Sequence, residues 1–339
     1  MVTIKQLAEV CNVSRGTIDR VINHRGNVKP EKRELVLRMM KKLNYTPNPA
    51  GKALAARKNK PVVGILMPAD GIRFFDTVLA AMEKAEKKYA MFGLKTIWRI
   101  THGYDIGMQC QILDELKGQV KALIINPIND PQVIHRLNQY IADGIFVVTL
   151  NNDVEQAAAH CYVGSDYLNG GETAAALLGM IGPKNLKVGI LMGSHKILGH
   201  QQRLTGFQHL MQTYPEASIA AIEENNDDDI LSYDVTKNML KAHPDINSLF
   251  IISSGGAYGA CRAVLALHKE KSVTIIAFDT IPTTIEMMKK QVIRAAIYQH
   301  PAQQGQRAMQ VVFDYLINGI KPEKGRYIMK NEIRILQNL

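Results

Sequence analysis

The stretch SRGTIDRVINHRG, residues 14–26, combines guanidinium groups with an apolar stripe. Arg15 and Arg20 stand on either side of Ile18, and Val21 follows directly. A guanidinium group presents a planar fork of donors, which can bind two phosphate oxygens together or the O6 and N7 atoms of one guanine. The stretch is therefore either the solvated face of a charged helix or a surface directed at a polyanion.

The net charge of the chain is concentrated at its N-terminal end. The 339 residues carry a formal charge of +10, from 41 Lys and Arg against 31 Asp and Glu. Residues 1–60 hold 14 of the basic and 4 of the acidic residues, so the other 27 basic and 27 acidic residues cancel. A basic module joined to a neutral body is what binding to a phosphate backbone requires, although a membrane surface or an acidic partner could use the same excess.

Cysteine usage and hydropathy exclude several classes of protein. The four cysteines are far apart and form no CxxC pair, so neither a disulfide framework nor a zinc site is expected. The N-terminal segment MVTIKQLAEV lacks the apolar core of a secretory signal, and no stretch approaches about 18 consecutive apolar residues. The sequence predicts a cytoplasmic protein with no membrane segment, metal or cofactor.

Residues 1–46 carry the pattern of an all-α helix-turn-helix domain. Thr3 and Ser14 are placed to cap two helices separated by a very short turn, and Pro30 suits the first turn of a third. In this architecture the second helix lies in the major groove and its first residues reach base edges. Gly16 would let the backbone come close there, and Asp19 could either orient Arg15 or accept from cytosine N4.

These residues resemble a known family. TIKQLAEVCNVSRGTIDRVIN and LNYTPNPAGKALAARK are similar to the DNA-binding headpiece of LacI-type (lactose repressor) transcriptional regulators, from Thr3 to Lys58. The resemblance implies that Arg15, Gly16 and Arg20 are the principal operator-reading positions. The full set expected at the DNA is Thr3, Ser14, Arg15, Gly16, Thr17, Asp19, Arg20, Asn23, His24 and Leu54. Asp19 departs from the family, which usually carries serine there, so the resemblance does not give the operator sequence.

Residues 47–60 would form the hinge helix and linker of that family. A helix of two or three turns beginning near Pro49 is marginal by itself in water. The resemblance implies that it orders only on the operator, where Leu54 wedges between base pairs in the minor groove. The alternative is a linker leucine that packs against the body.

Residues 61–339 alternate between short apolar runs and longer helical patterns. The runs are VVGILM (62–67), ALIIN (122–126), IFVVTL (145–150), VGILMG (188–193), LFIISS (249–254) and TIIAFD (274–279). The helical patterns span 75–91, 168–180, 200–213, 256–268 and 302–317. Apolar strands alternating with helices indicate parallel, doubly wound sheets, and the length favours two lobes. Polar segments such as NPIND, NND and DTIP follow the strands, where ligands of such sheets bind, and their amides and carboxylates suit a polyhydroxylated ligand.

The body resembles a type I periplasmic sugar-binding protein, the module that the LacI family uses to bind its effector. The similar segments include INPIND, VGSDYLNGGETAAALL, QRLTGF and AHPDINSLFIISSGGAYGACRAV. The resemblance implies an N-lobe of about 61–164 and 300–328 and a C-lobe of about 165–299 and 329–339. It also implies a cleft lined by Phe74, Phe75, Asn151, Asn152, Gln201, Ser253, Asp279 and Gln299.

The expected cleft departs from the family at several positions. Asn151-Asn152 replaces an Asp-Arg pair, Gln201 an arginine and Ser253 an asparagine. The loss of two arginines disfavours a carboxylated or phosphorylated effector, although Arg73 beside the cleft could restore one cation. The acidic run NNDDD (225–229) falls where an aromatic residue often covers the sugar, and we expect it to be a solvated loop.

Other functions are less consistent with these motifs. SSGGAYG lacks the spacing of a dinucleotide or P-loop motif, and no GxSxG or HExxH occurs, so an enzyme is not expected. A transport binding protein would have no use for residues 1–58. The sequence instead predicts a dimeric regulator, with no added heptad segment for a tetramer, that binds a palindromic operator under the control of a sugar or polyol. Sensing of a non-carbohydrate ligand or of a partner protein stays open, as does the choice between induction and corepression.

Overall fold

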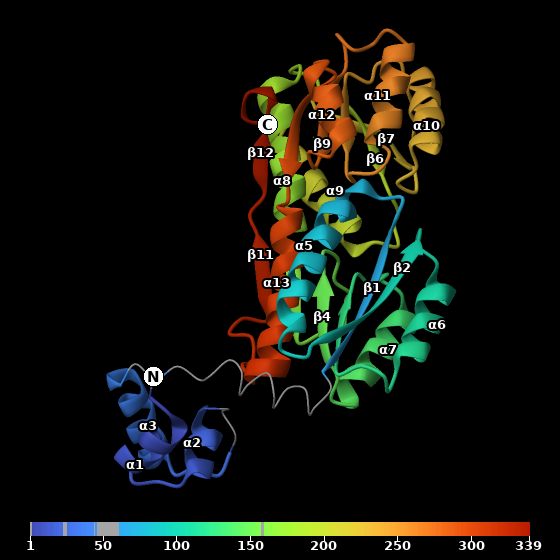
Figure 1. Cartoon of the computed structure of the whole chain (residues 1–339). Helices are drawn as coiled ribbons and strands as arrows, with labels where there is room; N and C mark the ends of the chain where they lie inside the picture. The colour runs from blue at the N-terminus through green and yellow to red at the C-terminus, as the bar shows by residue number, and fades with distance from the viewer. Residues whose placement is uncertain (1, 23–25, 44, 46–60, 157–158) are drawn as a thin grey trace.

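A computed structural model describes residues 2–22, 26–43, 45, 61–156 and 159–339. It contains a small helical headpiece and a body of two lobes, each built on one sheet (Figure 1). The expected DNA contacts Asn23, His24 and Leu54, and the expected hinge helix, lie outside the described residues.

The headpiece is a helix-turn-helix followed by a third helix. Its helices are α1 (Ile4–Val10), α2 (Arg15–Ile22) and α3 (Pro30–Lys42). Thr3 begins α1 with a capping box, since its Oγ1 accepts from the Gln6 amide at 3.2 Å while Gln6 Oε1 accepts from the Thr3 amide at 2.9 Å. Ser14 begins α2 with a simple cap, its Oγ accepting from the Thr17 amide at 3.1 Å. The core of this unit is made of Leu7, Ala8, Cys11, Ile18, Val21, Val36 and Tyr45.

Each lobe contains one six-stranded sheet in which nearly all neighbours run parallel. The N-lobe sheet has the order β11-β5-β4-β3-β1-β2. Its strands are β1 (Val62–Asp70), β2 (Lys95–His102), β3 (Ala122–Ile125), β4 (Phe146–Leu150), β5 (Cys161–Ser165) and β11 (Arg326–Met329). The C-lobe sheet has the order β12-β10-β9-β8-β6-β7, and only β12 pairs antiparallel in it. Its strands are β6 (Lys187–Met192), β7 (Ser218–Glu224), β8 (Ser248–Ile251), β9 (Thr274–Phe278), β10 (Ile293–Tyr298) and β12 (Glu332–Arg334).

Helices cover both faces of each sheet, because the central strands are apolar on both sides. The N-lobe helices are α5 (Arg73–Ala90), α6 (Ile106–Leu116), α7 (Pro131–Ala142) and α13 (Pro301–Phe313), with a π-helical turn η1 (Asp314–Asn318). The C-lobe helices are α8 (Tyr167–Ile181), α9 (Leu198–Met211), α10 (Asp229–Ala242), α11 (Ala257–Ala266) and α12 (Pro282–Lys289), with a 3₁₀ turn η2 (Leu336–Asn338). A headpiece joined to two doubly wound lobes confirms the fold class predicted from the sequence.

The chain passes between the lobes after β5, after β10 and between β11 and β12. These last two strands lie along one side of both lobes (Figure 1). The carboxyl ends of the parallel strands in both sheets lead toward the space between the lobes, so the loops that follow the strands meet there.

The backbones of α8 and α9 touch at two glycines. A Cβ on Gly171 would lie 2.0 Å from the carbonyl oxygen of Arg203, and one on Gly206 would lie 2.0 Å from that of Leu168. Neither carbonyl belongs to a flexible side chain that could move away. The contact therefore sets how close α9, with Arg203, comes to α8.

Gly171→Ala is expected to lower the free energy of unfolding by about 1–3 kcal/mol through overpacking. In a helix interior without this contact, the same change normally stabilises by up to about 1 kcal/mol. Urea unfolding monitored by circular dichroism measures the effect, with Gly325→Ala as the control because a Cβ there would meet nothing within 4 Å. An unchanged midpoint for Gly171→Ala would mean that the two helices separate at little cost.

Candidate functional site

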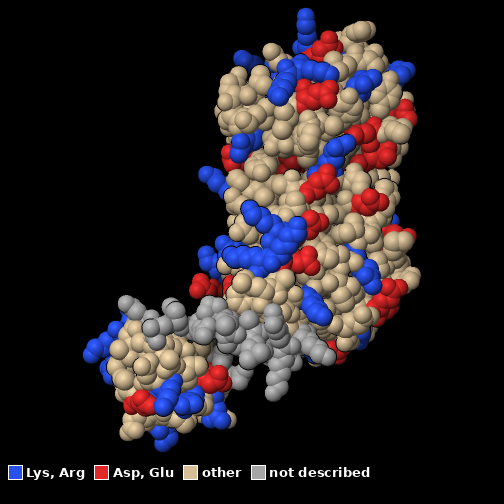
Figure 2. Space-filling model, in the orientation of Figure 1, with Lys and Arg blue, Asp and Glu red and all other residues tan. Residues whose placement is uncertain are grey.

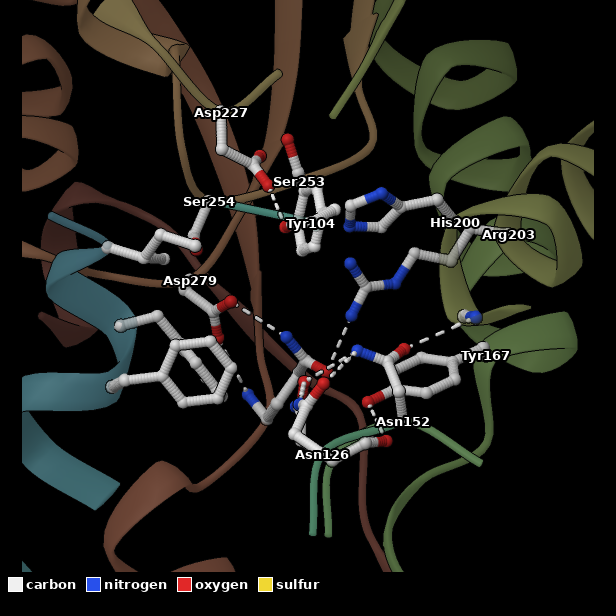
Figure 3. Close-up of a pocket in the computed structure, with 16 residues that line it drawn as sticks. Tyr104, Asn126, Asn152, Tyr167, His200, Arg203, Asp227, Ser253, Ser254 and Asp279 are labelled. Carbon is white, nitrogen blue, oxygen red and sulfur yellow. Dashed lines mark hydrogen bonds between the residues drawn. The ribbon is translucent and has the colours of Figure 1, made fainter. Parts of the chain in front are cut away.

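A polar cavity lies between the two lobes, at the carboxyl ends of the strands. The space between its lining residues that no atom fills is about 420 Å³, including the part open to solvent. Its lining, drawn in Figure 3, is Ile72, Phe74, Phe75, Tyr104, Asn126, Asn151, Asn152, Tyr167, Gly199, His200, Arg203, Asp227, Ser253, Ser254, Asp279 and Gln299.

Most of the residues expected in the cleft come together here. Phe74, Phe75, Asn151, Asn152, Ser253, Asp279 and Gln299 all line the cavity. The two phenylalanines begin α5 and pack edge to face, with ring centroids 5.2 Å apart. Ring faces and edges of this kind can pack against the aliphatic face of a sugar.

Gln201 does not line the cavity, which corrects the expectation from the sequence. Its side-chain amide donates to the carbonyl oxygen of His195, in the loop before α9. Because α9 begins at Leu198, the helical period turns Gly199, His200 and Arg203 toward the cavity and Gln201 away from it. The cavity thus contains a guanidinium that the expected cleft lacked. Arg73, the expected source of a cation, is exposed on α5 and outside the lining.

A chain of hydrogen bonds joins Asp279, Gln299 and Arg203 in the cavity, and Figure 3 labels the Asp279 and Arg203 side chains at its two ends. The Asp279 carboxylate accepts from Gln299 Nε2 at 2.7 Å, and Gln299 Oε1 accepts from an Arg203 Nη at 2.5 Å. The guanidinium also donates to the Ile252 carbonyl oxygen at 2.6 Å and lies 3.7 Å from the centroid of the Phe278 ring. Burial raises the pKa of Asp279 to about 7, and Arg203 opposes that rise. This buried carboxylate therefore titrates close to neutral pH.

Three asparagines form a fixed set of amides on the N-lobe side. Asn126 Nδ2 donates to Asn151 Oδ1 at 3.2 Å, and Asn152 Nδ2 donates to Asn126 Oδ1 at 3.3 Å. All three are buried. Amides oriented by one another present donors and acceptors in set directions, which is what recognition of several hydroxyl groups requires.

The acidic run 225–229 is only in part the solvated loop expected from the sequence, since Asn226, Asp228 and Asp229 are exposed whereas Asn225 is buried and Asp227 is half-buried. Asn225 is fully buried and donates to Ser232 Oγ at 3.3 Å. Asn226 and Asp227 have left-handed backbones, with φ of 50° and 59°, which turn the chain back over the strand ends. Asp227 consequently reaches the cavity, where its Oδ2 accepts a hydrogen bond from the Tyr104 hydroxyl (Figure 3).

Hydrogen bonds across the cleft hold the lobes in a closed arrangement. Tyr104 of the N-lobe donates to Asp227 of the C-lobe. The Gly199 amide of the C-lobe donates to Asn152 Oδ1 at 3.3 Å. At a more exposed point, the Asn129 amide donates to the Lys196 carbonyl oxygen at 3.0 Å.

Tyr104→Phe is expected to weaken effector binding about tenfold or more. The closed form would lose a hydrogen bond to a carboxylate, and such bonds contribute about 1.5–3 kcal/mol. The measurement is the effector concentration that half-saturates the response of operator binding. Tyr258→Phe, on α11 and outside the cavity lining, is the matched control. Equal half-saturation for the two variants would show that the Tyr104 contact does not favour closure.

In the headpiece, the expected DNA-reading residues lie at the surface of α2. Arg15, Gly16 and Arg20 are exposed, whereas Thr17 and Asp19 are half-buried. The hydroxyls of Thr3 and Ser14 serve as helix caps. Figure 2 shows Lys and Arg side chains around the headpiece with few acidic ones beside them, while the visible face of the body mixes both signs.

Within the described residues, no group of three His, Cys, Asp or Glu side chains could hold a metal ion. In the same part of the chain, no helix is long and apolar enough to span a membrane.

Two family models match the chain and divide it as the structure does. Residues 63–320 match the periplasmic binding protein domain, and residues 3–48 match the bacterial regulatory proteins of the lacI family. The chain belongs to the LacI family. This LacI-family protein is a DNA-binding transcriptional regulator, whose body has the periplasmic-binding-protein fold.

Individual relatives of this LacI-family regulator include regulators and binding proteins. The ribose operon repressor of Halalkalibacterium halodurans is 25% identical over 297 residues, covering 83% of this chain and 81% of that protein. The ribose import binding protein RbsB of Bacillus subtilis is 26% identical over 270 residues, covering 80% and 86%. Among solved structures, a solute-binding protein of an ABC transporter from Burkholderia graminis, in complex with D-arabinose, is similar with a TM-score of 0.76 at 21% identity, covering 82% and 96%. At that identity, the structural similarity supports the fold of the body.

Proposed function

We propose that this regulator binds a palindromic operator as a homodimer in the cytoplasm and responds to a small polyhydroxylated effector, a sugar or polyol. The observation that carries the proposal is the interlobe cavity, where amides and carboxylates from both lobes meet beside Phe74 and Phe75. Relatives named for ribose, among both repressors and binding proteins, support a sugar-like ligand.

In this proposal, α2 of each headpiece enters the major groove of one half-site. Arg15 and Arg20 are exposed on that helix, whereas Ile18 and Val21 hold it to the small core behind. The arginines would read guanine edges or grip phosphates while the apolar side chains fix the angle of the helix.

The effector would act by stabilising the closed arrangement of the lobes. Closure moves the N-lobes relative to the C-lobes within a dimer. It would therefore change the distance between the two points at which segments 47–60 join the N-lobes. A change in that distance would alter operator affinity. Coupling between two such sites is typically about 1–3 kcal/mol, or about 5–150-fold in affinity.

We propose that the cavity binds its ligand without transforming it. Ser253 Oγ donates to the Gly255 carbonyl oxygen at 3.1 Å, whereas His200 Nδ1 accepts from the Ser194 backbone amide at 3.1 Å. The serine and the histidine are thus each engaged with backbone groups instead of with one another. A hydrolytic mechanism would need them paired as nucleophile and base.

Selection from a random duplex library at physiological salt, using the purified protein, tests the DNA-binding part of the proposal. Recovery of one palindrome with a fixed centre is expected. That duplex then serves as the probe in a screen of sugars and polyols for altered operator affinity. Enrichment of a single unrepeated site would contradict the dimer, and a response to none of the sugars would contradict the effector class.

A further inference from the structure

We propose that the effector carries an ammonium group, as an amino sugar or aminopolyol does, and that Asp227 binds it. The inference rests on the proposed function and narrows the class of ligand. It starts from a carboxylate in the cavity of which one oxygen accepts a hydrogen bond and the other has no partner among the described residues.

Two glycines make room for the Asp227 side chain. A Cβ on Gly193 would lie 2.5 Å from Asp227 Oδ1, and a Cβ on Gly255 would lie 2.4 Å from Asp227 Cβ. These glycines follow β6 and β8, so two loops of the C-lobe leave the space that this carboxylate fills. Together with the left-handed turn at residues 226–227, these two glycines leave a niche in which the Asp227 carboxylate is directed into the cleft.

The niche leaves one carboxylate oxygen without a partner. Oδ2 of Asp227 accepts from Tyr104, but Oδ1 is buried and has no hydrogen-bond partner among the described residues. The same holds for Nε of Arg203, a residue that is only 4% exposed. Leaving such atoms unpaired is costly, so the ligand is expected to bring a donor to Asp227 and an acceptor to Arg203.

The charges that face the cavity show which kind of donor fits. Among the described lining residues, the charged side chains are Asp227, Asp279 and Arg203. The Arg203 guanidinium is bonded to Ile252 and Gln299 and packs on the rings of Phe278 and Tyr167, so it forms no ion pair with Asp227. Among the described residues, no cation is therefore bonded to the Asp227 carboxylate, and a ligand ammonium would balance its charge.

His200 does not supply the missing positive charge. Its Nδ1 lies 3.1 Å from the Ser194 amide nitrogen and 3.3 Å from the Ser194 carbonyl oxygen, so it is bonded to the backbone and not to Asp227. Burial lowers the pKa of His200 to about 4, which keeps the ring neutral at physiological pH. A hydroxyl of the ligand would satisfy Oδ1 of Asp227 as a hydrogen bond, but only an ammonium would satisfy both the hydrogen bond and the charge.

Isothermal titration of the full-length protein at pH 7 tests the inference with pairs of compounds that differ by one hydroxyl or ammonium. The probes are D-glucose and D-glucosamine, D-galactose and D-galactosamine, and D-glucitol and 1-amino-1-deoxy-D-glucitol. In a pair that binds, the amino compound is expected to bind about ten- to 100-fold more tightly.

The variant Asp227→Asn keeps the shape of the side chain and the acceptor for Tyr104, and it should abolish the preference for the amino compound. Asp234→Asn, an exposed aspartate on α10, should retain it.

The outcomes separate this inference from the proposed function. If the hydroxyl compounds bind as tightly as the amino compounds or more tightly, the proposal of an ammonium group is wrong, and the proposed sugar-like effector class is retained. A preference for the amino compound that survives in Asp227→Asn assigns the ammonium to another group and overturns the role of Asp227. If neither member of any pair binds, the proposed sugar-like effector and this inference are both wrong, whereas the proposed operator binding is unaffected.

Discussion

Replacing Arg15 with alanine is expected to weaken binding to the selected operator by about 1–3 kcal/mol, or about 5–150-fold. Arg15 is exposed in the first turn of α2, the part of a recognition helix that reaches base edges. A bidentate contact to guanine O6 and N7 would be lost, and the preference at one base pair of each half-site should relax. Fluorescence anisotropy against operators substituted at each position measures both effects.

The matched control is Arg38→Ala, which removes an exposed arginine from α3. It should weaken binding slightly and equally on all sequences, as expected for a residue that contributes general positive charge. If Arg15→Ala behaves in the same way, Arg15 contacts phosphate, and base recognition belongs to other residues of the headpiece.

Asp279→Asn is expected to remove the effector response while operator binding in the absence of effector stays intact. The Asp279 carboxylate is 2% exposed and lies at the end of the chain of bonds through Gln299 to Arg203. A hydrogen bond to a charged group contributes about 1.5–3 kcal/mol, so the loss of the carboxylate should weaken effector binding roughly tenfold or more. The measurement is operator binding as a function of effector concentration. A normal response from Asp279→Asn would remove Asp279 from the effector site.

The pKa of Asp279 gives this site a pH dependence with a definite sign. Burial raises the pKa of the carboxyl from 3.8 to about 7. Ligand hydroxyls donate to the ionised form, so effector affinity should fall as the pH drops below about 7. Stability responds in the opposite direction: the contribution of Asp279 is fully present below pH 3.8 and is lost as the pH rises through about 7. Titration calorimetry and urea unfolding between pH 5.5 and 8 measure the two effects, and Asp279→Asn should flatten the stability profile.

Local sequence determined the headpiece. The caps at Thr3 and Ser14 and the apolar spacing of α1 and α2 depend on residues three or four positions apart, so they can be inferred without knowledge of the rest of the chain. Six of the inner strands, β1, β3, β4, β6, β8 and β9, could also be predicted from the sequence, because burial on both faces demands continuous apolar runs. The edge strand β2 carries no such run because it is only partly buried.

The cavity shows where inference from the sequence ended. Asp279, Gln299 and the asparagine pair follow apolar strands directly, so their place at the strand ends could be predicted. Arg203 was missed in favour of Gln201, because the face that α9 turns inward depends on its packing against α8 at Gly171. The helical period from Gly199 was the one signal that could have identified it.

Asp227 is the clearest case of a residue whose role only the tertiary structure decided. In the sequence it belongs to an acidic run, which is typical of a solvated loop. Its place in the cavity depends on Gly193, Gly255 and Tyr104, which lie 28 or more positions away along the chain and come from three different loops. The sequence by itself determined the kind of module at each end of this protein, since patterns of capping and burial are local. The charges that face the ligand were decided by packing between distant segments, which local patterns do not contain.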